Sequence, residues 1–172
     1  TIAHVKGYMH AAEKLQFGAV TNRPDDGMRF ENDPNNVGIF SVHHRSSDDF
    51  ILSLASWAHG NKSSKQSVLL FLDGLQLVAD MEVDTVQNLR WLLLRGPSRR
   101  VWPIVTLSTA HLGKMDSWLS AFRTYIFGMV EDPAHTQRLN VENADLGSLE
   151  AGTEFTLSEE QHWLRLWLPT LD

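Results

Sequence analysis

The sequence predicts an α/β domain in which helices flank a mostly parallel sheet and a β-hairpin ends the chain. The first observation is the run Val68 to Leu72, which is apolar without polar alternation, as in a parallel strand covered on both faces. The second is that short strand-like runs alternate with segments of helical periodicity. The third is a pair of strand-like runs at 154–157 and 163–168, joined by the polar residues 158–161, which indicates a terminal hairpin.

Each expected element follows from its own pattern of apolar residues. Helical spacing predicts helices over 2–15, 46–59, 84–94 and 115–122. Compact apolar runs predict further strands over 17–20, 37–42, 101–107 and 125–130. Strands that alternate with helices in this way favour right-handed crossovers and a parallel sheet.

Local signals set several element boundaries. Ser46 lies three residues before Asp49, a spacing like that of a capping box, and predicts a helix start. Gly60 suits the left-handed conformation that often ends a helix, and Gly96-Pro97 predicts the end of the next one. Pro103 has no N–H to give to a sheet, so we expect the pairing of its strand to begin late.

Composition restricts the classes of protein to consider. The 172 residues are expected to form a single domain, with 145–172 as a hairpin extension, and to begin inside a helix of a longer protein. The chain has no cysteine, which excludes disulfides and thiolate metal sites and fits a cytoplasmic location. No apolar run is long enough to cross a bilayer. The net charge of -6 argues against a generally basic nucleic-acid-binding surface.

Asp73 is the strongest candidate for chemistry. It follows the apolar run Val68 to Leu72 directly, and a carboxylate at the carboxyl end of a central strand faces the crevice where α/β proteins bind ligands. In P-loop ATPases an aspartate in this position helps to hold the magnesium that bridges the nucleotide phosphates. The simpler alternative is that Asp73-Gly74 starts a turn or caps the following helix.

The order of the elements resembles that of the FtsK/HerA-type motor ATPases. In both, a strand ending in aspartate is followed by a helix, an arginine-bearing loop (here Arg99-Arg100) and a strand with polar residues near its end (here Ser108-Thr109). The resemblance covers most of the chain and implies a P-loop NTPase-like fold. It also implies that Asp73 is the metal and cofactor ligand, that Ser108 and Thr109 hydrogen-bond near the nucleotide, and that Arg99 or Arg100 reaches a neighbouring subunit.

The resemblance further implies ATP and magnesium as the parent family's cofactors, a homo-oligomeric ring, and DNA as a partner that is translocated. In this family, the strand before the phosphate loop lies between the strands that correspond to 101–107 and 125–130. Without it, we expect 125–130 to pair directly with 101–107, or a segment of another copy to fill the gap in a dimer or larger assembly.

Three departures from the family pattern concern activity. No Gly-x-x-x-x-Gly-Lys-Ser/Thr loop occurs in the chain, and Gly60-Asn61-Lys62-Ser63 has the wrong spacing and follows a helix. Gly74 stands where an active member usually has a glutamate that polarises the attacking water. Ala110 stands where the family often has a polar residue. We therefore expect a fragment or degenerate member without activity of its own.

Two other interpretations remain open. The chain could be a non-catalytic protein-interaction domain on a P-loop-like scaffold, or an unrelated doubly wound α/β ligand-binding domain, because a fold does not fix a function. A histidine metal site at His43-His44 is disfavoured, since no His-Glu-x-x-His motif occurs.

The missing phosphate loop gives a direct prediction. A phosphate cradle needs successive backbone N–H groups at a helix N-terminus together with a lysine, and the chain offers neither at the required spacing. The chain alone should show no ATPase activity above background and no millimolar-or-better affinity for Mg-ATP. Isothermal titration calorimetry that measured micromolar binding would contradict this expectation.

Overall fold

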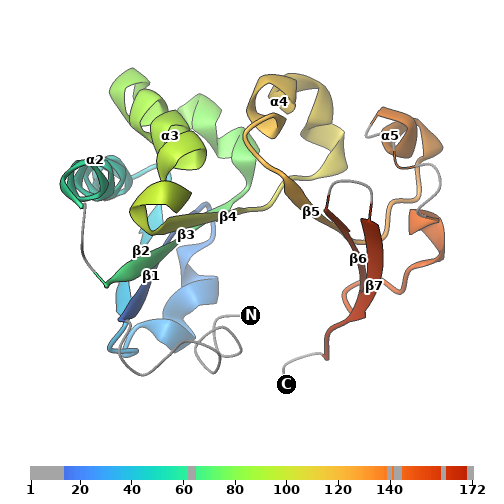
Figure 1. Ribbon diagram of the computed structural model, residues 1–172, viewed down its shortest axis with the longest axis horizontal. Coiled ribbons are helices and arrows are strands. Elements are labelled where there is room, and N and C mark those ends of the chain that lie inside the picture. Colours follow the sequence, from blue (N-terminus) through green and yellow to red (C-terminus); the bar gives the residue numbers. More distant parts are fainter. Residues whose placement is uncertain (1–13, 62–64, 139–140, 142–144, 160–161, 170–172) are drawn as a thin grey trace. The chain divides into compact units, whose positions relative to one another are not determined.

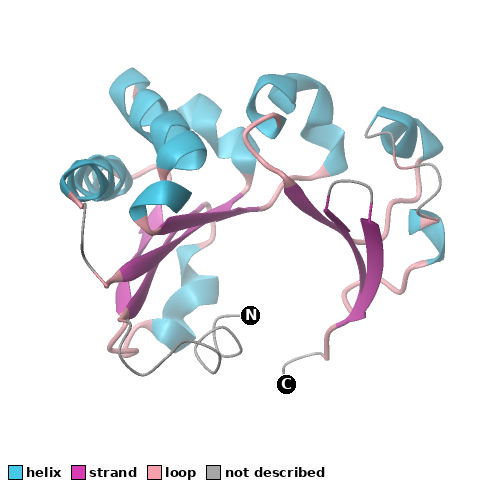
Figure 2. Ribbon diagram, in the orientation of Figure 1, coloured by secondary structure: helices cyan, strands magenta, loops and turns pink. Residues whose placement is uncertain are grey.

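The computed structural model describes residues 14–61, 65–138, 141, 145–159 and 162–169. The chain divides by internal contacts into two compact units, the first ending at Leu107 and the second beginning at Ser108. Each is described below by itself, and the prediction of one single domain stays a prediction. Figures 1 and 2 show the elements of both units. Within the described residues, no helix is long and apolar enough to cross a membrane.

The first unit is built on a four-stranded sheet in which every described pair of neighbours is parallel (Figure 1). Its strands, in spatial order, are β2 (Asn36–Ser41), β1 (Leu15–Thr21), β3 (Ser67–Asp73) and β4 (Val101–Val105). β3 pairs along its length with β1 on one side and β4 on the other, which explains why its sequence is apolar on both faces. The predicted parallel α/β sheet and the central position of β3 are confirmed.

Helices cover the sheet of the first unit. Figure 1 shows α2 (Arg45–Gly60) and α3 (Val83–Arg95) on one face and the 3₁₀ segment η1 (Pro24–Phe30) on the other. Two further 3₁₀ segments, η2 (Leu75–Asp80) and η3 (Pro97–Arg99), flank α3. The helices bury Ile51, Leu54, Leu89 and Leu92. On the opposite face, Phe30 of η1 packs against the cluster of Leu15, Phe17 and Leu69.

Several predicted boundaries need correction. Leu15, expected at the end of a helix over 2–15, begins β1 instead, and residues 2–13 lie outside the described residues. α2 starts at Arg45 because the His44 ring accepts a hydrogen bond from the backbone N–H of Ser46, so no Ser46 capping box forms. Gly60 belongs to the helix, with Asn61 as the cap, because the turn does not enter the left-handed region there.

Pro103 is accommodated by the direction in which its backbone points. The amide of Val68 donates to the carbonyl of Arg100 (2.9 Å), and the amide of Thr106 donates to the carbonyl of Leu72 (3.0 Å). Because alternate residues of a parallel strand bond the same neighbour, even-numbered residues of β4 bond β3 and Pro103 faces away. Pairing therefore begins at the first residue of β4, and the expected late start is wrong.

The second unit contains an antiparallel sheet in the order β5-β6-β7, whose strands are β5 (Thr124–Phe127), β6 (Glu154–Glu159) and β7 (His162–Trp167). Its other elements are η4 (Thr109–His111), α4 (Leu112–Leu119), α5 (Pro133–Arg138) and η6 (Leu146–Ser148). The predicted hairpin is confirmed. A core of Val130, Val141, Leu146 and Leu149 packs against Phe127.

Three expectations for the second unit change. The helix predicted over 115–122 ends at Leu119, and the strand predicted over 125–130 ends at Phe127. That strand pairs with β6, so it does not join β4, whose described partner is β3 alone. The hairpin supplies a continuous row of partners to one side of β5 along Thr124–Phe127, so β5 is an edge strand of this sheet. Filling of the β4 edge by another copy stays a prediction.

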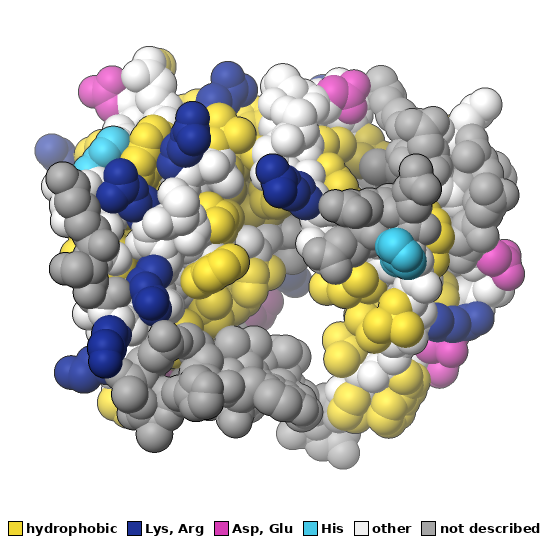
Figure 3. Space-filling model, in the orientation of Figure 1, with side chains coloured by type: hydrophobic (Ala, Val, Ile, Leu, Met, Phe, Trp, Pro, Cys, Tyr) yellow, Lys and Arg dark blue, Asp and Glu magenta, His cyan; other side chains and the backbone are white. Residues whose placement is uncertain are grey.

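Exposed apolar residues gather on the antiparallel sheet. Figure 3 shows hydrophobic side chains over β6 and β7. Trp163, Leu164 and Trp167 are among the exposed large residues of the chain. At the first residue of β6, the backbone N–H of Glu150 and the guanidinium of Arg165 both donate to Glu154 and hold the pKa of its carboxyl below its ordinary value.

Adding one methyl group at either of two glycines in the first unit should have opposite effects on the free energy of unfolding. A Cβ on Gly96 would clash with the backbone carbonyl oxygens of Leu92 and Val101, whereas a Cβ on Gly60 would meet nothing within 4 Å. We expect Gly96→Ala to lower the free energy of unfolding by about 1–3 kcal/mol through overpacking. Gly60→Ala should raise it by up to about 1 kcal/mol, because alanine favours the helix. Urea denaturation of both variants checks this, and equal effects would contradict it.

Candidate functional site

Three polar side chains from neighbouring strands meet at the carboxyl edge of the parallel sheet. Thr21 ends β1, Asp73 ends β3, and Thr106 follows β4. The hydroxyl of Thr21 donates to Oδ2 of Asp73 (2.9 Å), and the hydroxyl of Thr106 donates to Oδ1 (3.1 Å). Both oxygens of the predicted site carboxylate therefore accept a hydrogen bond from a threonine.

The strand register produces this arrangement. Thr21 and Asp73 are direct partners in the β1–β3 pairing, so their side chains leave the sheet on the same side. Gly74 follows β3 with a φ of 109°, a conformation that glycine adopts without strain. The next amide, of Leu75, donates to the carbonyl of Thr106 at 2.8 Å, which fixes the turn beside the site.

Arg23 adds a positive charge to the site. Its guanidinium lies 3.7 Å from Oδ2 of Asp73, and its backbone N–H donates to the hydroxyl of Thr21 at 3.0 Å. The Asp73 side chain is 41% exposed and that of Arg23 is 68% exposed, so this ion pair contributes little to stability. It does place a positive charge where a ligand of Asp73 would bind.

The other predicted site residues lie elsewhere. Arg99 and Arg100 precede β4, at the amino edge of the sheet, and the five residue steps of β3 from Val68 to Asp73 separate the two edges by about 16 Å. Asn61 donates to the carbonyl of Arg99 at 3.1 Å, which ties that loop to the end of α2.

The remaining pair of predicted residues begins the second unit. Ser108 precedes η4 and accepts a backbone hydrogen bond from His111, and Thr109 is the first residue of η4. The partner that the structure gives to Asp73 is Thr106 instead.

Sequence reasoning missed Thr21, Thr106 and Arg23. Thr21 and Thr106 are each the first polar residue after an apolar run, as Asp73 is, and this shared position is the signal that could have found them. Arg23 carries no such signal, since it lies in a turn whose direction only the folded chain sets.

The residues at this edge fit the magnesium of a nucleotide complex and not a free metal ion. Magnesium in such complexes takes one or two carboxylates, with substrate phosphates and water as its other ligands, and Asp73 could supply one such carboxylate, oriented by two threonine hydroxyls. Within the described ranges, no three His, Cys, Asp or Glu side chains are grouped so that they could hold a metal. His44 is engaged as the cap of α2.

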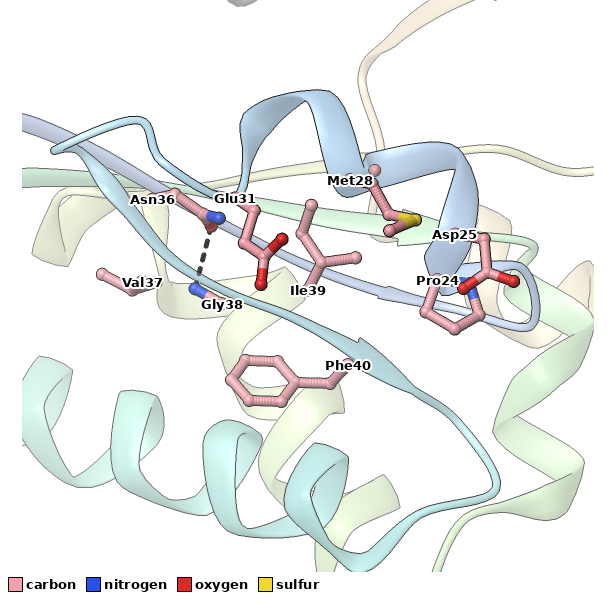
Figure 4. Close-up of a pocket in the computed structure, with 10 residues that line it drawn as sticks. Pro24, Asp25, Met28, Glu31, Asn36, Val37, Gly38, Ile39 and Phe40 are labelled. Atoms are coloured by element: carbon pink, nitrogen blue, oxygen red, sulfur yellow. Dashed lines mark hydrogen bonds between the residues drawn. The ribbon is translucent and has the colours of Figure 1, made fainter.

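A separate hollow of about 480 Å³ lies between η1 and β2 (Figure 4). Asp25 and Glu31 are the carboxylates that line it, and Met28 and Ile39 contribute apolar surface. The amide of Gly38 donates to the side-chain oxygen of Asn36 at 2.9 Å. Nothing in this hollow converges on a single point as the threonines do on Asp73.

Comparison with solved structures identifies the fold. The protein is similar to a monomer form of the pCW3 conjugation coupling protein TcpA with ATPγS (TM-score 0.64, 13% identity, covering 89% of this chain and 51% of that one). It is also similar to EssC, ATPases 2 and 3, from Geobacillus thermodenitrificans (TM-score 0.68, 12% identity, covering 91% and 33%). These neighbours are FtsK/SpoIIIE-type P-loop ATPases, and this chain shares their fold.

A third neighbour extends the same likeness. EccC from Thermomonospora curvata, ATPases 2 and 3 in complex with a signal sequence peptide, matches with a TM-score of 0.60 and 10% identity over 95% of this chain and 32% of that one. The chain thus spans about half the length of TcpA and a third of EssC and EccC. A scan of protein-family models and a search of curated proteins found no match. At these identities the likeness concerns the fold, and it confirms the predicted resemblance.

The threonine contacts predict energetic coupling with Asp73. Thr21 is 6% exposed, so its hydrogen bond to the carboxylate is shielded from water, and Thr21→Val should lower the free energy of unfolding by about 1–3 kcal/mol. A double-mutant cycle with Asp73→Ala, measured by urea denaturation, should give a coupling of about 0.5–3 kcal/mol. The control is Thr106→Val, whose bond is exposed and should couple more weakly. Zero coupling for Thr21 would contradict the contact.

Proposed function

We propose that the chain is a fragment or degenerate member of an FtsK/HerA-like ATPase that supplies the magnesium-side carboxylate and lacks ATPase activity on its own. The observation that carries this proposal is the position of Asp73, at the carboxyl end of the central parallel strand with one threonine hydroxyl on each oxygen. A carboxylate held in this way is oriented before any ligand arrives, which is what a metal-bridged phosphate site requires.

Each residue at the edge has a role in this proposal. Asp73 accepts the ion, while Thr21 and Thr106 fix the direction of its two oxygens. When bound, magnesium neutralises charge on the phosphates of the nucleotide. Arg23 balances the charge of Asp73 and would move aside if a cation bound, because its side chain is largely exposed and has a second ion-pair partner in Asp26. Ser108 and Thr109 are proposed to hydrogen-bond near the nucleotide.

The chain lacks the parts that hold and hydrolyse a nucleotide. No phosphate loop occurs, Gly74 replaces the glutamate that would polarise water, and Ala110 replaces a polar residue. Activity in the parent protein therefore depends on other segments. Arg99 and Arg100 lie at the opposite edge from Asp73, so we propose that they act across a contact between copies, in a homo-oligomer.

The wider role of the parent protein rests on resemblance. TcpA is a conjugation coupling protein and EccC is described as a cytoplasmic domain of a type VII secretion ATPase. By analogy we propose a cytoplasmic, ATP-driven motor that translocates a polymer. DNA is the substrate that the FtsK/HerA resemblance favours.

A second candidate is a non-catalytic protein-interaction domain on the same scaffold. The contact of Arg23 with Asp73 favours it, because a guanidinium beside the carboxylate occupies the place of a metal ion. In that case Asp73 would serve to hold the ends of β1, β3 and β4 together.

Two measurements on the native full-length protein that contains this chain separate the candidates. Asp73→Asn should reduce Mg-dependent ATP hydrolysis by about 100-fold or more, since it removes the charge that holds the ion. Asp116→Asn, on α4, is the matched control and should leave the rate unchanged. If Asp73→Asn leaves the rate of ATP hydrolysis intact, the proposed role of Asp73 as the magnesium-side carboxylate fails. If the full-length protein hydrolyses no ATP, it is not an active motor, and a degenerate member or the interaction domain remains.

A further inference from the structure

A second hollow, of about 750 Å³, lies in the first unit beside the amino ends of α2 and α3. Its acidic residues are Asp48 and Asp49 on α2, Asp80 at the end of η2, Glu82 before α3, and Asp84 on α3. We call these residues, with Thr85, the acidic hollow. Arg45 is the one guanidinium that lines it. In the described part of the chain, none of the five carboxylates has an ion-pair partner.

Helix electrostatics account for part of this cluster. Asp48 and Asp84 lie in the first turns of α2 and α3, where negative charge offsets the helix dipole. Glu82, the N-cap residue of α3, also lies near the positive end of that helix. Asp49 and Asp80 have no such role, and they add negative charge to a hollow that is already acidic. The dipoles of α2 and α3 therefore account for only some of the unpaired carboxylates in the hollow.

Two buried polar atoms lie in the same place without a partner. Thr85 is 1% exposed and lines the hollow, and its hydroxyl oxygen has no hydrogen-bond partner among the described residues. One carboxylate oxygen of Asp48, Oδ1, is also buried and unpaired there. A buried polar group without a partner is costly, and native proteins rarely leave one unless a ligand or water completes it.

The chemistry of these groups selects the ligand. Carboxylates and a threonine oxygen accept hydrogen bonds, so the ligand must be a cation with several N–H donors. A bare metal ion does not fit, because no three acidic or histidine side chains of the described ranges converge on one point. A guanidinium presents five N–H donors in a planar fork that pairs with carboxylates bidentately. Its positive charge is complementary to a hollow whose acids come from several elements.

We propose that the acidic hollow binds an arginine-bearing peptide segment of a partner protein. One guanidinium donates to Asp48 Oδ1 and the Thr85 hydroxyl, and further basic residues of the segment pair with the outer carboxylates. This binding site shares no residue with the Asp73 site. It would operate whether or not the parent protein hydrolyses ATP.

The first experiment tests charge and location. The full chain is titrated against a fluorescein-labelled oligo-arginine peptide by fluorescence anisotropy, with the same peptide carrying citrulline in place of arginine as the neutral control. We expect binding of the arginine peptide alone. Glu82→Gln should weaken it about threefold, because an exposed ion pair contributes little. Glu131→Gln, an equally exposed acid of the second unit, should leave it unchanged. Equal binding of both peptides, or equal effects of both variants, would overturn the proposal.

The second experiment tests the buried hydroxyl. Thr85→Val keeps the shape of the side chain and removes its oxygen, so it should weaken the arginine peptide about tenfold. Thr85→Ser keeps the oxygen and should retain most of the affinity. Thr85→Val should also raise the melting temperature of the free chain, because the unpaired hydroxyl is gone, and this rise shows that the variant folds. Unchanged peptide affinity in a folded Thr85→Val variant would rule out the hydroxyl as part of the site.

Discussion

The pairing of β3 with two parallel neighbours is the constraint on which the rest of the first unit depends. Because β1, β3 and β4 run in the same direction, their carboxyl ends lie on one edge of the sheet. The residue that follows each apolar run therefore lies outside the core, at that edge. A carboxylate and two threonines, which are far apart in the sequence, are brought within hydrogen-bond distance by this single geometric fact.

The outer edge of β4 limits what can be added to the sheet. Odd-numbered residues of β4 turn their backbone groups toward that edge, and Pro103 contributes no donor to it. The side chains of Trp102 and Ile104 are 49% and 43% exposed, so the strand also presents apolar surface. A strand that paired here would gain apolar contacts and lose one ladder hydrogen bond at the proline. The outer edge of β4 therefore favours a pairing strand that needs no hydrogen bond from Pro103.

The distribution of charge divides the first unit into two ends. Arg99 and Arg100 lie at the amino edge of the sheet, and Asp73 lies at the carboxyl edge. The acidic hollow is also formed by segments that leave the carboxyl edge, since α2 follows β2 and η2 follows β3. The carboxyl edge thus attracts cations, whether a metal ion with its phosphates or a basic side chain, and the amino edge attracts anions. One copy of the chain cannot bring its two arginines to a ligand held by its own Asp73.

The sequence by itself determined the class of the fold, the central strand, the helix over 84–94 and the terminal hairpin, because apolar periodicity records which faces are buried. It also singled out Asp73 and showed that the phosphate loop is missing. It did not determine the start of α2, which a histidine side chain caps, or the partner of β5, which depends on a strand about 30 residues further along the chain. The threonine contacts to Asp73 and the unpaired Thr85 hydroxyl were decided by tertiary structure alone. Strand register and helix packing set those distances, and neither is recorded in local sequence pattern.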